Sequence, residues 1–485
     1  MGPNRRRFEV LARMNRRARV GGLGLVLALA ACGDVGDPLG DADAVPDSVQ
    51  ADAGGDGADG GGDGDAGGGD GGDGDAAHDH ESHSHGGTDA GDAGDGSGEG
   101  DAAHDHDSHS HGGTDTWLDA EPDGSGAPTD WVWDSPAGLP PPRVPEGNPM
   151  SVAKVELGRW LFYDTRLSLN ETQSCGSCHE QALAFTDGRA RGLGSTGEEH
   201  PRSSMSLVNI AYVPRLTWAN PNLRTLEQQA LLPLFGEAPV ELGMSGREDT
   251  LLARIRGDAA YVARFADAFP ERAVGGADPI TVASIADAIA AFQRSILSAN
   301  SPYDQYRAGD RSALSDAERR GMDLFFSEQL ECFHCHGGPL FADSLDHTRL
   351  PVAEVAFHNT GLYNLDGAGA YPDNNRGVMD VSERPEDMGR FRAPTLRNIA
   401  VTAPYFHDGS ALTLDDVIDH YAAGGRTIAE GPYAGVGATS PLKSESLIGF
   451  ELTDTQRADL IAFLNSLTDQ DVLTNPRWSN PHAAP

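Results

Sequence analysis

The sequence predicts a mainly α-helical protein of two domains with long loops, preceded by a disordered tail. Three observations predict this. Roughly the first quarter of the 485 residues lacks the large apolar side chains that a core needs. The strongest periodic stretches of the remainder have helical spacing, and few alternating strand patterns compete with them. Two Cys-x-x-Cys-His motifs, at 175–179 and 332–336, lie in that remainder.

Residues 1–32 predict an export signal. Seven arginines precede an apolar run at 20–31, which is too short to span a bilayer. The run ends in Leu29, Ala30, Ala31 and Cys32, a pattern typical of bacterial lipoproteins. We therefore expect a periplasmic lipoprotein held to a membrane by a lipid on Cys32. The alternative is an ordinary signal peptide with an incidental cysteine.

Residues 33–134 predict a disordered tether. Gly, Asp and Ala dominate it, and residues 33–130 hold 27 of the 74 acidic residues and no Lys or Arg. Burial cannot offset the entropy of ordering such a segment. Residues 75–89 recur at 101–115 with one Glu-to-Asp change, and each copy has four histidines. These tracts can bind Zn, Cu or Ni; a solvated spacer grown by duplication is the alternative.

The formal net charge of −38 comes mostly from that tether. No basic cluster beyond it could follow nucleic-acid phosphates, so a nucleic-acid partner is disfavoured. Of the five cysteines, four fall in the two Cys-x-x-Cys-His motifs and the fifth is Cys32. No cysteine is left for a disulfide, although an exported protein would normally use spare cysteines in that way.

Capping patterns predict where the main helices begin. Asp278, followed by a first-turn proline, is expected to open one helix. Ser315 and Thr453 are each expected to begin a capping box, with Glu318 and Gln456 three residues later. The residues expected on the buried faces are Ile285, Ile289, Phe292 and Ile296, then Met322 and Phe325, then Leu460, Phe463, Leu464 and Leu467.

Each Cys-x-x-Cys-His motif is typical of covalent attachment of a c-type haem. The two thiols add to the haem vinyl groups, and the next residue, a histidine, is held beneath the iron. A zinc site would need a second ligand pair at matching spacing. We therefore expect cytochrome c-type domains at 135–310 and 311–485. The expected haem-binding residues are Cys175, Cys178 and His179 in the first domain and Cys332, Cys335 and His336 in the second.

Four segments resemble the bacterial di-haem cytochrome c peroxidases and the related enzyme MauG. Residues 156–168 and 174–179 resemble the opening of these enzymes, and 394–399 and 402–409 resemble their second domain. The likeness covers about residues 145–470. It implies that the first haem is peroxidatic and that the second passes electrons.

The resemblance also implies catalytic residues near the first haem. Glu241 matches an acid near the open face of that haem, where a carboxylate can move a proton between the two peroxide oxygens. Gln229 and Pro233 match its neighbours. Read from the residues alone, Glu241 is a helix-start or surface acid.

In the peroxidases a loop histidine caps the first iron until activation, and Ser195 stands at that place here. Serine cannot replace imidazole as an iron ligand, so the first haem is expected to be open to peroxide, as in MauG. His200 lies nearby in the sequence. It either lines the pocket or merely caps the loop.

The axial methionine of the peroxidases is replaced by Tyr421, the substitution that MauG also has. Thr413 and Asp416 are expected to start a helix that turns Tyr421 inward, as an iron ligand or as a core aromatic. His420, about 100° around the helix, is the rival ligand. Because methionine ligation raises haem potential, tyrosine should lower it and disfavour routine electron acceptance from a small cytochrome.

Two further features follow from the resemblance. Trp218 matches the tryptophan between the two haems, where an indole can relay oxidising equivalents or simply pack in the core. A calcium ion also lies between the haems in this family. Its carbonyl ligands match Thr402 and Pro404, but its Asn ligand is replaced by Ser203, and a hydroxyl is a weaker ligand.

The loop 194–202, the phrase 216–221 and Tyr421 together look most like the MbnH-type di-haem enzymes. That resemblance implies that hydrogen peroxide drives a high-valent di-haem state, which oxidises a tryptophan of a partner protein to kynurenine, often in a copper-handling context. One alternative is a conventional cytochrome c peroxidase that takes electrons from a small cytochrome. A second alternative is a non-catalytic electron carrier.

Overall fold

The computed structural model describes residues 131–133 and 139–483, and these residues are mainly helical, as predicted. The predicted signal, Cys32 and both histidine repeats lie outside the described residues. Within the described part, no helix is long and apolar enough to cross a bilayer.

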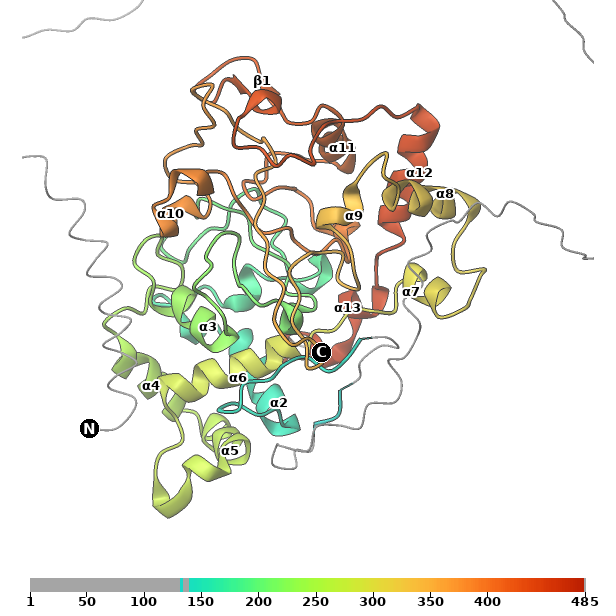
Figure 1. Cartoon of the computed structure of the whole chain (residues 1–485). Coiled ribbons are helices and arrows are strands. Elements are labelled where there is room, and N and C mark those ends of the chain that lie inside the picture. The colour runs from blue at the N-terminus through green and yellow to red at the C-terminus, as the bar shows by residue number, and fades with distance from the viewer. Residues whose placement is uncertain (1–130, 134–138, 484–485) are drawn as a thin grey trace, which may run out of the picture. The chain divides into compact units, whose positions relative to one another are not determined.

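The described secondary structure consists of helices, short 3₁₀ turns and one small hairpin (Figure 1). Strands β1 (Thr427–Ile428) and β2 (Gly435–Val436) pair antiparallel. The helices are α2 (Val152–Phe162), α3 (Leu226–Phe235), α4 (Glu248–Arg256), α5 (Ala259–Ala268), α6 (Val282–Arg294), α7 (Pro302–Arg307), α8 (Asp316–Phe325), α9 (Cys332–Cys335), α10 (Met379–Ser382), α11 (Leu414–Ala422), α12 (Asp454–Asn465) and α13 (Gln470–Thr474).

Two pairs of crossing helices frame the fold. Helix α2 packs on α6 in the lower part of Figure 1, and α8 packs on α12 at its right. Each pair meets at a glycine. A Cβ atom on Gly158 would lie 1.9 Å from the carbonyl oxygen of Ala288, and one on Gly321 would lie 1.9 Å from that of Asp459. Glycine is needed at both crossings because any side chain would push the helices apart.

The capping boxes predicted at Ser315 and Thr453 are present, and α8 and α12 begin directly after them. The predicted start at Asp278 is wrong. Helix α6 begins at Val282, and its capping box joins Thr281 to Ser284. The side chain of Asp278 instead accepts a hydrogen bond from the backbone of Ile280, which makes a turn before the helix.

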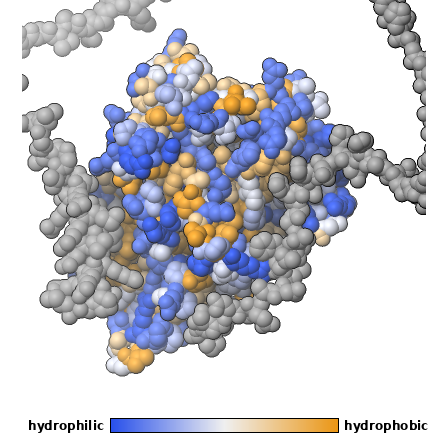
Figure 2. All heavy atoms as spheres, in the orientation of Figure 1, coloured by the Kyte–Doolittle hydropathy of each residue, from blue (hydrophilic) through white to orange (hydrophobic). Residues whose placement is uncertain are grey.

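The hydrophobic core has one large cluster around α2, α3, α5 and α6 and a second around α8 and α12. Ile285, Ile289, Phe292 and Ile296 are fully buried in the first, and Phe325, Phe463 and Leu467 in the second. Trp133 packs against a smaller cluster that contains Tyr212. Hydrophobic residues are interspersed among hydrophilic ones on the face shown in Figure 2, as on most protein surfaces.

Candidate functional site

The first Cys-x-x-Cys-His motif forms a single tight turn. The backbone amides of Cys178 and His179 both donate to the carbonyl oxygen of Cys175, at 3.2 and 3.0 Å. The Nδ1 atom of His179 lies 2.8 Å from the carbonyl oxygen of Phe185 and therefore donates to it. This hydrogen bond fixes the ring and leaves Nε2 as the atom free to bind a metal.

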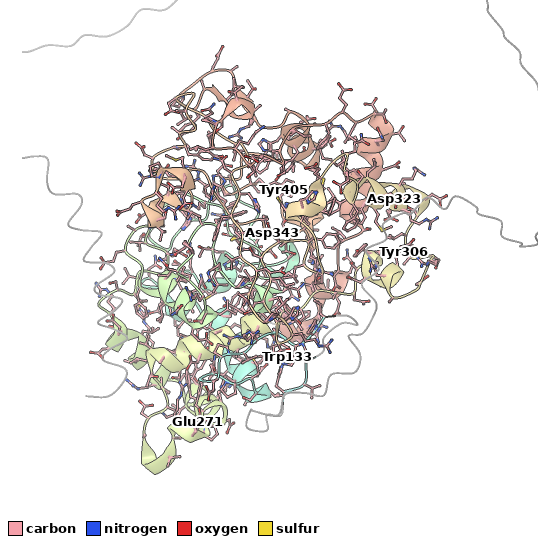
Figure 3. The ribbon with its side chains drawn as sticks, in the orientation of Figure 1. Trp133, Glu271, Tyr306, Asp323, Asp343 and Tyr405 are labelled. Carbon is pink, nitrogen blue, oxygen red and sulfur yellow. The ribbon has the colours of Figure 1, made fainter. Side chains whose placement is uncertain are left out.

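The second motif repeats this arrangement on α9. The amide of His336 donates to the carbonyl oxygen of Cys332 at 2.9 Å. Its Nδ1 atom lies 3.1 Å from the carbonyl oxygen of Phe341, again leaving Nε2 free. The carboxylate of Asp343, labelled in the middle of Figure 3, lies within 4.8 Å of the thiol of Cys335 on this helix. The chain thus holds two equivalent turns, each with two thiols and one oriented imidazole.

A cavity lies against each motif. The first cavity is bordered by Cys175, Cys178 and His179, and the second by Cys332, Cys335 and His336. Both have largely apolar walls. Those walls include Leu207, Leu216, Leu226 and Ile289 in the first cavity, and Phe325, Leu340, Leu460 and Leu464 in the second.

Glu241 borders the first cavity, as do Gln229 and Pro233 of α3. Two backbone hydrogen bonds hold the segment around Glu241 in place. The amide of Leu242 donates to the carbonyl oxygen of Pro233, and the amide of Ser195 donates to the carbonyl oxygen of Glu241. Within the described part of the chain, the Glu241 carboxylate has no hydrogen-bond partner. Burial raises the pKa of this carboxyl to about 7. Glu241 can therefore both accept and release a proton near neutral pH.

The loop after the first motif closes one side of this cavity. Gly194, Glu198 and His200 border the cavity, whereas Ser195 does not. The Nδ1 atom of His200 accepts a hydrogen bond from the amide of Arg202 at 3.1 Å, and burial lowers the pKa of the ring. His200 thus borders the pocket and ties the loop together at the same time.

Helix α11 carries Tyr421 into the wall of the second cavity, together with Leu414, Val417 and Ile418. The predicted cap is present, since Thr413 and Asp416 form a capping box. Among the described residues, the Tyr421 hydroxyl has no hydrogen-bond partner, and burial raises its pKa. The phenolate would therefore need a nearby cation, which a ferric iron can supply.

His420 is buried but lies outside the lining of that cavity. Its ring packs against Phe406, with centroids 4.8 Å apart, and burial lowers the pKa of the ring to about 4. Of the two neighbours on α11, Tyr421 is thus the one that faces the second cavity.

Trp218 borders both cavities. Its Nε1 atom donates to the carbonyl oxygen of Ser203 at 2.9 Å. Ser203, Thr402 and Pro404 all border the second cavity, and the Ser203 hydroxyl donates to the carbonyl oxygen of Phe406 at 3.1 Å.

Arg392 also borders both cavities, and sequence reasoning missed it. It is 4% exposed and has no ion-pair partner within the described residues. Burial lowers the pKa of its guanidinium to about 10, so it keeps its charge at neutral pH. An arginine in a loop has no periodic pattern by which a sequence could reveal its burial.

The residues present fit two covalently bound haems. Each motif offers two thiols on one turn and an imidazole whose Nε2 faces away from that hydrogen bond, and the cavity walls are apolar. The buried guanidinium of Arg392, which borders both cavities, would be a cation for haem propionates. The chemistry of this donor set is that of a di-haem c-type cytochrome.

Comparisons with known proteins agree with that class. The sequence model of the family described as di-haem cytochrome c peroxidase matches residues 152–312. The cytochrome-c peroxidase IdrP1 of Denitromonas iodatirespirans is 35% identical over 347 residues, covering 68% of this chain and 85% of the relative. The methylamine utilization protein MauG of Methylorubrum extorquens is 32% identical, covering 67% and 80%.

Solved structures are also similar. The chain matches a MauG-like protein associated with microbial copper homeostasis with 52% identity and a TM-score of 0.70, covering 72% of this chain and 99% of that one. The di-haem peroxidase BthA of Burkholderia thailandensis, at 22% identity and a TM-score of 0.52, shares the fold.

The chain is therefore a di-haem peroxidase-type oxidoreductase with two c-type haems as its cofactors. More particularly, it belongs to the di-haem cytochrome c peroxidase family, which includes the MauG proteins.

Proposed function

We propose that this enzyme uses hydrogen peroxide to oxidise a partner protein at tryptophan, rather than to oxidise a small cytochrome. The observation that carries the proposal is the position of Trp218, which borders both cavities, with Glu241 in one and Tyr421 in the other. When bound, the two haems supply the centres that accept and store the oxidising equivalents of peroxide.

Glu241 is the proposed proton carrier. A carboxyl with a pKa near 7 can take a proton from one peroxide oxygen and return it to the other. Gln229 and His200, which border the same cavity, would orient peroxide and limit water. Tyr421 is the proposed ligand of the second iron, and Trp218 the proposed relay between the two sites.

The setting proposed is copper handling in the periplasm. The MauG-like protein of known structure is associated with copper homeostasis, and more than half of its matched residues are identical here. The histidine repeats at 75–89 and 101–115 would bind copper or zinc, and a lipid on Cys32 would hold the enzyme at a membrane.

A calcium ion on Thr402, Pro404 and Ser203 is also part of this proposal. Equilibrium dialysis of the wild type and of Ser203→Ala against calcium tests it.

A conventional cytochrome c peroxidase is the second candidate, because several relatives bear that name, among them IdrP1 and the enzyme of Escherichia coli. Steady-state assays separate the two. The proposed function predicts slow turnover with reduced cytochrome c, together with peroxide-dependent mass gain at a tryptophan of a co-purified partner. Brisk turnover with cytochrome c and no modified tryptophan would favour the conventional peroxidase.

A further inference from the structure

A chain of aromatic rings leads from Trp218 to the protein surface. The ring of His407 lies 6.4 Å from that of Trp218 and 6.4 Å from that of Tyr371, measured between centroids. Tyr371 lies 5.4 Å from Tyr363, and Tyr363 lies 5.7 Å from Tyr433. These residues come from four separate loops of the chain.

The inner rings are buried and the last one is not. His407, Tyr371 and Tyr363 are 5%, 2% and 7% exposed, whereas Tyr433 is 39% exposed. Tyr433 lies in the turn between β1 and β2, at the top of Figure 1. This series of aromatic rings therefore connects Trp218, which borders both cavities, to Tyr433, which is exposed enough for another protein to contact.

The ring of His407 is held rigidly at the inner end. It stacks on Phe391, with centroids 3.6 Å apart and planes 10° from parallel. Among the described residues its buried Nε2 atom has no hydrogen-bond partner, and burial lowers the pKa of the ring to about 3. A neutral ring in fixed contact on both sides can bridge electron transfer between Trp218 and Tyr371 without adding a charge.

The three tyrosines differ in the groups that can accept their phenolic protons. The Tyr371 hydroxyl donates to the side-chain oxygen of Asn359 at 2.9 Å, and an amide is a poor base. The Tyr363 hydroxyl donates to the carboxylate of Asp408, and Tyr433 is partly exposed to water. Since an oxidised tyrosine sheds its phenolic proton, oxidation is easier at Tyr363 than at the more deeply buried Tyr371, and Tyr433 can release its proton to bulk water.

Asp408 is able to accept the phenolic proton of Tyr363. Burial opposes its ionisation, but hydrogen bonds from Tyr363 and Ser410 and the charge of Arg426 hold the pKa of its carboxyl below the ordinary value. The guanidinium of Arg426 lies 3.8 Å away. Asp408 is thus an ionised base in contact with the Tyr363 hydroxyl.

We propose that Tyr433 is the surface site at which electrons from a partner protein enter this enzyme. Tyr363 and Tyr371 carry the electrons inward, and His407 passes them to Trp218. This inference rests on the proposed function and locates the partner's oxidised side chain at the turn between β1 and β2.

The electrons balance as follows. One hydrogen peroxide takes two electrons and two protons and gives two waters. Tyr433 loses one electron and its phenolic proton, then regains both from the partner's indole, and this happens twice. The indole, having lost two electrons and two protons, takes its oxygen from water. A second peroxide and hydrolytic loss of formate lead to kynurenine.

The test uses the full-length holo-protein, one equivalent of hydrogen peroxide and the nitroso spin trap 2-methyl-2-nitrosopropane, without a partner. Peptide mass spectrometry locates the trapped radical, and peroxide consumption is measured in the same samples. We expect the adduct on Tyr433 in the wild type and its loss in Tyr371→Phe and, independently, in Tyr363→Phe, since phenylalanine keeps the packing but not the oxidisable hydroxyl.

Tyr306 provides the matched control. It is a half-buried tyrosine on α7, labelled at the right of Figure 3, and no ring contact links it to the aromatic chain. Tyr306→Phe should leave the Tyr433 adduct unchanged. The inference is overturned if the adduct on Tyr306 equals that on Tyr433, or if the Tyr433 adduct survives in both Tyr371→Phe and Tyr363→Phe. If the protein still consumes peroxide in that case, the proposed function stands. A wild type that consumes no peroxide overturns both.

Discussion

The indole Nε1 atom of Trp218 donates a hydrogen bond of 2.9 Å to the carbonyl oxygen of Ser203, and this bond fixes the indole at the wall shared by the two cavities. An indole at that position can relay electrons between the two haems because its ring is oxidisable, whereas a phenylalanine ring is not.

Replacing Trp218 with phenylalanine should therefore uncouple the haems. We expect peroxide still to react at the first haem of Trp218→Phe while the second haem no longer responds. Stopped-flow optical spectra measure both responses. Trp160→Phe is the control, because Trp160 packs against His482 and borders neither cavity. A second-haem response at the wild-type rate would contradict a relay through Trp218.

The reaction with peroxide should depend on the ionisation of Glu241. Because burial raises the pKa of this carboxyl to about 7 and only the carboxylate can accept a proton, the rate should rise with pH through about 7 and then level off. Glu241→Gln should slow the reaction by roughly 10²–10⁴-fold and flatten the profile. A profile that keeps its rise in Glu241→Gln would assign the titration to another group.

Tyr421 and His420 can be separated by the potential of the second haem. Methionine ligation raises haem potential, so Tyr421→Met should raise the midpoint potential and speed turnover with reduced cytochrome c. His420→Phe should leave the potential unchanged, since His420 lies outside the second cavity. Spectroelectrochemical titration tests both, and the reverse pattern would make His420 the ligand.

The buried positive charge of Arg392, which borders both cavities, should favour electron gain at both haems. Removing a buried cation in Arg392→Gln should lower both midpoint potentials. Arg224→Gln is the control, because Arg224 is exposed and borders neither cavity. Unchanged potentials in Arg392→Gln would place the haem propionates away from this residue.

The helix crossings should be intolerant of any side chain. Gly158→Ala and Gly321→Ala each place a Cβ atom 1.9 Å from a carbonyl oxygen and should cost about 1–3 kcal/mol of unfolding free energy or more. Thermal unfolding followed by circular dichroism measures this loss. Gly147→Ala meets no atom of the described residues within 4 Å and should melt like the wild type. Equal melting of all three variants would contradict the close crossings.

Local patterns predicted much of the helical frame. The capping boxes at Ser315, Thr413 and Thr453 were readable because each depends on residues three apart in the sequence. The same reasoning failed at Asp278, where a polar residue before a proline made a turn instead of a helix start. The capping box that begins α6 lies three residues further on, at Thr281 and Ser284.

By itself, the sequence determined that this chain attaches two c-type haems, because thiol and imidazole chemistry is encoded within five consecutive residues. Only the tertiary structure decided that Tyr421 faces the second cavity while His420 does not, and that Arg392 lies beside both cavities. Only the tertiary structure, too, connects Tyr433 to Trp218 through aromatic rings that come from separate loops. Those relationships depend on long-range packing, which leaves no periodic trace along the chain.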